Sequence, residues 1–146
     1  MGLDMYLSAK QFAWPHLEDT LYNTIKKLDW PVPPQHAEIS ACVAYWRKAN
    51  QIHDWFVQNV QGGVDECQAS YVSKDQLIEL RDLCVRLLQS KNPEEALQDL
   101  PPANGFFFGS DEINEWYWED LQDTVNQLNP LIESDQALDY EYHASW

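Results

Sequence analysis

The chain has 146 residues, of which 45% are hydrophobic, and it carries a formal net charge of −15. This length suits one domain, and this composition excludes a disordered chain and favours a globular core. A charge this negative also argues against direct binding of nucleic acid, which is itself an acid.

The three cysteines and the N-terminal residues bear on the cellular compartment. Cys42, Cys67 and Cys84 are odd in number and form no CxxC motif, which indicates reduced thiols. No apolar run approaches the roughly 20 residues that a membrane-spanning helix needs. The N-terminus has an acid where a signal peptide carries Lys or Arg. We therefore expect a cytoplasmic protein with no membrane association.

The acids are distributed unevenly. Residues 1–91 hold all nine basic residues and 11 acids, whereas residues 92–146 hold 13 acids and no Lys or Arg. Such a segment attracts basic partners or cations. The alternative is that the acids serve only to keep the protein in solution.

The first third of the chain predicts a strand, a helix and a stiff connector. Residues 5–7 are short and β-prone. Residues 17–28 place leucine and isoleucine at helical spacing, with acids at the start and lysines at the end. The sequence D-W-P-V-P-P then stops the helix, because proline cannot continue it.

Residues 38–61 predict one long helix that ends at Gly62-Gly63. Apolar residues recur at spacings of three and four, and Asn50 and His53 fall on the same face. The pattern puts Arg47 and Gln51 on the opposite, polar side. It also points Trp55 towards solvent, as it does Trp118 on a later helix.

The middle of the chain predicts a short strand and two helices. Tyr71-Val72 is β-prone, and Ser73 with Gln76 forms a capping box that opens a helix over 74–90. Pro93 begins one more short helical turn.

The last third predicts a buried extended segment, a helix and a strand. Three phenylalanines lie between Gly105 and Gly109, and Ser110 is expected to cap a helix that starts at Asp111. Ile113, Trp116 and Tyr117 begin its inner face, and Pro130 is expected to end or kink it. Residues 138–142 alternate with period two, as in a strand, and could pair with residues 5–7. The predicted fold is therefore a single α+β domain over residues 1–146, mainly helical, with a small antiparallel sheet joining the N- and C-terminal strands.

Five polar or aromatic residues fall on the inner faces of the two main predicted helices. A buried His or Asn needs partners, and a carboxylate such as that of Asp120 is a natural one. The group forms either a hydrogen-bonded core network or the lining of a small-molecule pocket, as an enzyme or a ligand-binding protein would have. Its members are Trp46, Asn50, His53, Tyr117 and Asp120.

Other chemistry has less support. A catalytic thiol would need Cys84 or Cys42 beside His53, but a free cysteine on an apolar face is usually a small hydrophobic residue. The four histidines show no metal-binding spacing, and no phosphate-binding glycine motif occurs. We expect no catalytic residue, no metal and no cofactor.

Four stretches together resemble a family of small proteins encoded by bacteriophages and prophages. They are M-G-L-D-M-Y-L, Y-W-R-K-A-N-Q-I-H-D-W-F, G-F-F-F-G-S with E-W-Y-W-E-D-L, and the end Y-H-A-S-W. The resemblance covers about half of the chain and implies a viral origin but no chemistry. Small acidic phage proteins often bind and inhibit a host factor, some of them as DNA mimics or anti-CRISPR-like inhibitors. We therefore expect a basic host protein, such as a nuclease or a defence complex, as the partner. The expected contact residues are Asp111, Glu112, Glu115, Trp118, Glu119 and Asp123.

Overall fold

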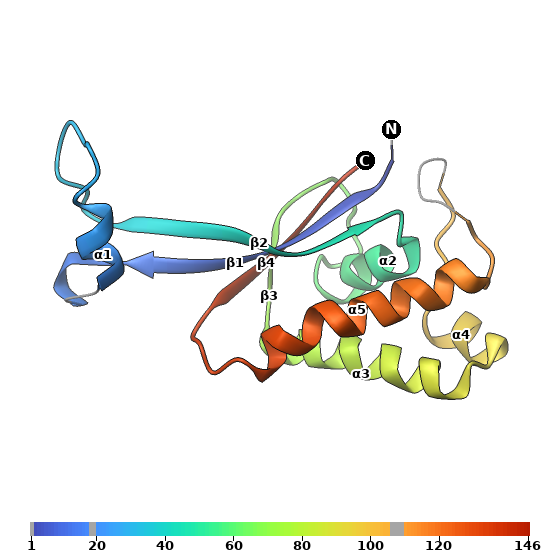
Figure 1. Cartoon of the computed structure of the whole chain (residues 1–146). Coiled ribbons are helices and arrows are strands. Elements are labelled where there is room, and N and C mark those ends of the chain that lie inside the picture. The colour runs from blue at the N-terminus through green and yellow to red at the C-terminus, as the bar shows by residue number, and fades with distance from the viewer. Residues whose placement is uncertain (1, 18–19, 106–109) are drawn as a thin grey trace.

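The computed structural model describes residues 2–17, 20–105 and 110–146. Figure 1 shows the arrangement of the elements. In chain order they are β1 (Asp4–Ala13), the 3-10 turn η1 (Pro15–Leu17), α1 (Thr20–Ile25), β2 (Ala37–Arg47), α2 (Asn50–Asn59), β3 (Ser70–Val72), α3 (Lys74–Ser90), α4 (Pro93–Asp99), α5 (Glu115–Glu133) and β4 (Asp139–Ser145).

The four strands form one antiparallel sheet in the order β2-β1-β4-β3. The N-terminal strand β1 pairs with the C-terminal strand β4, so that Leu7 lies opposite Tyr142. Residues 5, 7 and 9 of β1 are buried while their neighbours are partly exposed, as expected when one face of a sheet is covered. The structure confirms the predicted α+β fold and the sheet that joins the two ends of the chain.

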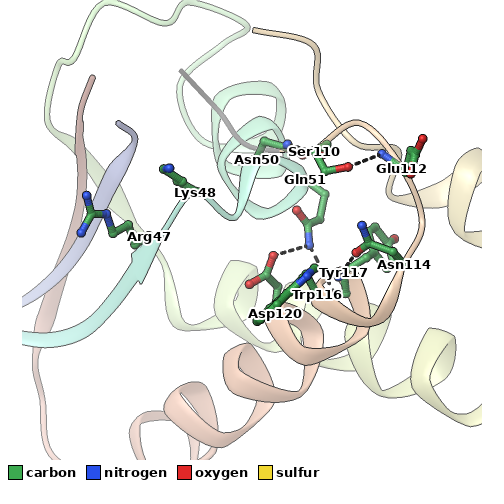
Figure 2. A pocket seen from close by; sticks show the side chains of 10 residues that line it. All are labelled: Arg47, Lys48, Asn50, Gln51, Ser110, Glu112, Asn114, Trp116, Tyr117 and Asp120. Carbon is green, nitrogen blue, oxygen red and sulfur yellow. Dashed lines mark hydrogen bonds between the residues drawn. The ribbon is translucent and has the colours of Figure 1, made fainter. Parts of the chain in front are cut away.

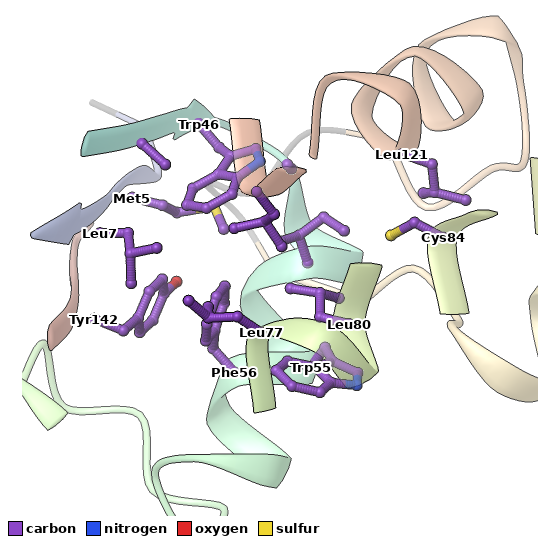
Figure 3. Close-up of a cluster of buried hydrophobic side chains, with 14 of the residues drawn as sticks. Met5, Leu7, Trp46, Trp55, Phe56, Leu77, Leu80, Cys84, Leu121 and Tyr142 are labelled. Atoms are coloured by element: carbon purple, nitrogen blue, oxygen red, sulfur yellow. The ribbon is translucent and has the colours of Figure 1, made fainter. Parts of the chain in front are cut away.

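The core lies between the sheet and helices α2, α3 and α5, which gather beside the sheet. Figure 3 shows Phe56 of α2 beside Tyr142 of β4, and their rings stack with centroids 3.9 Å apart and an angle of 8° between the planes. Trp46 of β2 donates its indole N–H to Thr124 of α5 over 2.9 Å. These contacts hold the sheet against the helices.

The prediction of one long helix over residues 38–61 is wrong for the first half of that range. Residues 37–47 form strand β2, and the helix begins only at Asn50. Between them Lys48 has a φ of 59°, a left-handed conformation that interrupts regular structure. Spacings of three and four at residues 39–46 suit a helix, but backbone pairing with the ten-residue strand β1 decides the conformation.

A hairpin arm extends beyond the rest of the sheet. β4 begins opposite Lys10, so from there outwards β1 and β2 pair only with each other. We call residues 10–40 the arm; Figure 1 shows it reaching away from α2, α3 and α5, with α1 at its far end. The helix predicted over 17–28 is shorter in the structure, Thr20–Ile25, and follows the η1 turn.

Helix ends are mostly where the sequence places them. Ser73 and Gln76 form the predicted capping box at the start of α3, and α4 begins at Pro93 as predicted. Helix α5, however, is capped by Asn114 and not by Ser110, and it continues through Pro130 to Glu133. The buried segment predicted between Gly105 and Gly109 lies mostly outside the described residues.

Candidate functional site

The outer face of α5 carries a row of exposed carboxylates. Glu115, Glu119 and Asp123 follow one another at four-residue steps, which places them on one side of the helix. Asp111 and Glu112, just before the helix, are exposed as well. No salt bridge joins any of these five acids to a Lys or Arg within the described residues. The row therefore presents uncompensated negative charge to solvent.

The exposed aromatic residue beside this row is Trp116. Its side chain is 72% exposed, the highest value among the large hydrophobic residues of the described chain. The sequence placed Trp116 on the inner face and Trp118 outside, and this assignment is wrong. Trp118 is half-buried and packs against the core, with its ring edge-on to Tyr117 at a centroid distance of 5.0 Å. The buried face of α5 is instead formed by Tyr117, Leu121, Thr124, Val125 and Leu128.

A pocket of about 280 Å³ opens beside Trp116, between the start of α5 and the start of α2. Figure 2 shows its lining, which brings Asn50, Tyr117 and Asp120 together as the sequence suggested. The remaining lining residues are Arg47, Lys48, Gln51, Ser110, Glu112, Asn114 and Trp116. His53 and Trp46 do not line this pocket, so the predicted group of five is divided.

Asp120 is the partly buried acid of the pocket. Its carboxylate accepts a hydrogen bond from Nε2 of Gln51 over 3.1 Å. Burial raises the pKa of Asp120 to about 6, because removal from water disfavours the charged carboxylate; the bond from Gln51 acts in the opposite direction. Gln51 itself is only 3% exposed, although the helical pattern assigned it to the polar side.

Asn50 joins the pocket wall to two loops. Its amide nitrogen donates to the carbonyl of Ser110 over 2.9 Å, and its side-chain oxygen accepts from the backbone N–H of Ala103 over 3.1 Å. Neither of these two bonds goes to His53, Tyr117 or Asp120, the other members of the predicted core network. Asn50 instead fixes the segments that lead into α5.

His53 is buried and has its own partners. Nδ1 lies 2.6 Å from Oη of Tyr142, and Nε2 lies 2.9 Å from Oδ2 of Asp65. Trp146 donates its indole N–H to the other oxygen of Asp65 over 3.0 Å. The prediction that His53 is a satisfied core residue agrees with this arrangement, but its carboxylate partner is Asp65 and not Asp120.

Two further expectations concern cysteine and tryptophan. Cys84 is fully buried between α3 and α5 (Figure 3), and burial raises the pKa of its thiol to about 12. Burial and a raised pKa make this thiol a poor nucleophile, which argues against the catalytic alternative at Cys84. Trp55 is 8% exposed and belongs to the core, so its predicted exposure is wrong.

In the part of the chain that the structure describes, no three His, Cys, Asp or Glu side chains gather closely enough to hold a metal ion. Over the same residues, every helix is too short or too polar to cross a bilayer.

Sequence reasoning missed the residues that come from turns. Ser110 and Asn114 reach the pocket because the chain turns twice before α5, and Lys48 reaches it through its left-handed backbone. Asn114 carried a signal, since Asn followed by an acid is a common helix start. Nothing in the sequence indicated the position of Lys48.

In comparisons with known proteins, no protein-family model, no curated protein and no solved structure matches this chain.

Proposed function

We propose that this chain is a phage or prophage accessory protein that binds and inhibits a basic host protein through the outer face of α5, in the host cytoplasm. The observation that carries the proposal is the exposed row Glu115, Glu119 and Asp123 beside an exposed Trp116, in a segment without Lys or Arg. Nucleic-acid-binding and defence proteins have the basic surfaces that such a face attracts.

The geometry of the row suits a groove or helix rich in Lys and Arg. Residues four apart on a helix are separated by about 6 Å along its axis. The row thus holds three charges over about 12 Å, and Asp111 and Glu112 add charge at its start. So short a row supports a partner that makes a few strong contacts more than one that follows a long strand.

Trp116 supplies the apolar part of the contact. Exposed tryptophans surrounded by polar residues are common centres of protein interfaces. An indole face also attracts the guanidinium of an arginine through a cation–π interaction. Trp116 and the neighbouring carboxylates together therefore favour an arginine-bearing partner, since one side chain could contact both.

The proposal can be tested by capturing partners from a host lysate at low salt. Immobilised wild-type protein is compared with a variant carrying Glu115→Gln, Glu119→Gln and Asp123→Asn. We expect a basic protein that elutes with salt from the wild type and is absent from the variant. If the same proteins bind both forms, the α5 face is not the binding surface.

A second function is supported by the pocket beside Trp116. It combines the partly buried carboxylate of Asp120 with two cations, Arg47 and Lys48. Such a lining suits a small zwitterion, with an ammonium group at Asp120 and an anionic group near Lys48. The test is a titration with amino acids and related zwitterions, followed by the NMR signals of the Asn50 and Gln51 side-chain amides. Shifts that saturate, and that Asp120→Asn abolishes, would establish this second function; unmoved signals would remove it.

A further inference from the structure

The arm exposes much of the apolar surface of this protein. Six of the twelve large hydrophobic residues that are exposed in the described chain lie on it. They are Phe12, Trp14, Leu28, Trp30, Val32 and Ile39. Apolar side chains gathered on one projecting element are characteristic of an interaction surface.

The arm also has a free strand edge. β2 lies at the edge of the sheet, and β1 is the only described strand that pairs with it. Close to the helices this edge is covered, because the side chain of Gln127 donates to the carbonyl of Tyr45 over 2.9 Å and accepts from its N–H over 2.8 Å. Further out, residues 38–42 are all exposed. An uncovered edge of this kind is a template for another strand.

The charge of the arm selects among possible partners. Residues 10–40 contain three lysines and four acids, a net charge of −1 in a chain of −15. Most of the net charge, −13, lies in residues 92–146, so two copies that meet through these segments repel each other strongly. The nearly neutral arm is a part of the chain where a second copy meets little repulsion.

The edge is compatible with pairing to itself. In an antiparallel register centred on Ser40, Ile39 lies opposite Ala41, and Glu38 lies opposite Cys42. Glu38 is further neutralised by Lys10, whose Nζ is 3.1 Å from its carboxylate. No like charges oppose each other, which is the condition that a self-pairing strand must meet.

We propose that two copies of this chain associate at the base of their arms, with the outer edges of the two β2 strands, residues 38–42, pairing antiparallel across a two-fold axis. The pairing joins the two sheets into one. It also brings the apolar side of the two β2 strands, marked by Ile39 and Ala41, into one continuous strip. This association is independent of the binding function proposed for α5.

The first test is the mass of the protein in solution as its concentration is raised into the range of about 100 μM, a range in which weak dimers form. We expect a monomer–dimer equilibrium at physiological salt. Ile39→Lys, a change that natural edge strands use to block pairing, should weaken the dimer by about tenfold or more. Val64→Lys is the matched control, since Val64 is similarly exposed but lies in the loop after α2, and it should leave the dimer unchanged.

A second measurement locates the contact without relying on that variant. Ser40→Cys is introduced together with Cys42→Ser and Cys67→Ser, and the protein is treated with a short bismaleimide. Rapid formation of covalent dimer is expected, whereas Ala137→Cys in the same background should react slowly. A protein that stays monomeric overturns the proposal, and so does a dimer that neither responds to Ile39→Lys nor cross-links at position 40. If the protein stays monomeric and its arm becomes shielded only when a basic partner binds, the arm is a binding surface for that partner and not for a second copy.

Discussion

The imidazole of His53 lies 2.9 Å from the carboxylate of Asp65, and this pair ties three separate parts of the chain together. The other ring nitrogen is 2.6 Å from the hydroxyl of Tyr142 in β4, and Asp65 also accepts from the indole of Trp146. One arrangement satisfies all of these groups: Nε2–H donates to Asp65, and the Tyr142 hydroxyl donates to Nδ1. Helix α2, the loop after it and the last strand are thereby joined in the core.

Replacing His53 should therefore destabilise the protein. His53→Leu leaves the Tyr142 hydroxyl buried without its partner and removes one of the bonds to Asp65, so we expect a loss of about 2–4 kcal/mol. Equilibrium unfolding in urea measures this loss. Gln58→Leu, on the exposed side of the same helix, is the control and should change stability little. A loss below about 1 kcal/mol for His53→Leu would contradict the assigned network.

The raised pKa of Asp120 predicts a pH-dependent stability. The pKa rises from an ordinary 3.8 to about 6 on folding, so between these values the folded state holds a proton that the unfolded state has lost. The free energy of unfolding therefore falls as pH rises through this window. Above about pH 6 the carboxylate is charged in the folded state, and its full destabilising effect is present. Asp120→Asn removes the destabilising charge, so the variant should be more stable than the wild type by an amount that grows from pH 4 to pH 7. Glu133→Gln is the control for loss of one charge; an equal gain in both variants would contradict the assignment.

The accessibility of the three thiols tests the rejected catalytic thiol. Cys42 is exposed, Cys67 is half-buried and Cys84 is buried with a raised pKa. Iodoacetamide at neutral pH should label Cys42 first and should label Cys84 only after unfolding in urea. Peptide mass spectrometry identifies the labelled sites. Labelling of Cys84 in the native protein as fast as that of Cys42 would restore it as a candidate nucleophile.

Trp116 and Trp118 should respond differently to replacement. Trp116→Ala removes a side chain that is 72% exposed, so stability should stay within about 0.5 kcal/mol of the wild type. Trp118→Ala removes part of the packing between α5 and the core and should cost more. In binding assays with an arginine-rich peptide, Trp116→Ala should weaken affinity about tenfold, whereas Tyr71→Ala, another exposed aromatic residue, should not. Unchanged affinity for Trp116→Ala would show that the indole is not a contact.

The elements that the sequence predicted well are those with local signals. The capping box at Ser73, the proline that begins α4 and the alternation at 138–142 are each set by residues close together in the chain. Strand β2 was missed because its conformation is decided by pairing with β1, whose partner residues lie 24 to 43 positions away in sequence. The same error placed Gln51 outside and Trp55 in solvent. Locating the helix start at Asn50 would have required the left-handed turn at Lys48, for which lysine gives no signal.

The pocket was predictable only in part. Helical spacing brought Asn50, Tyr117 and Asp120 onto facing surfaces, and the structure places all three around one pocket. The partner of His53 was not predictable, because Asp65 lies in a loop whose path depends on tertiary contacts.

The central claim, that the outer face of α5 binds basic partners, is tested most directly by the affinity for an arginine-rich peptide at low and at physiological salt. Two triple variants with the same change in charge are compared with the wild type. One carries Glu115→Gln, Glu119→Gln and Asp123→Asn, and the other carries Glu133→Gln, Asp135→Asn and Asp139→Asn, all of them exposed acids of the last 55 residues. We predict that affinity falls with salt and that the first variant loses at least about tenfold, while the second loses about threefold or less. Equal losses in both variants, or an affinity that salt does not change, would contradict the account.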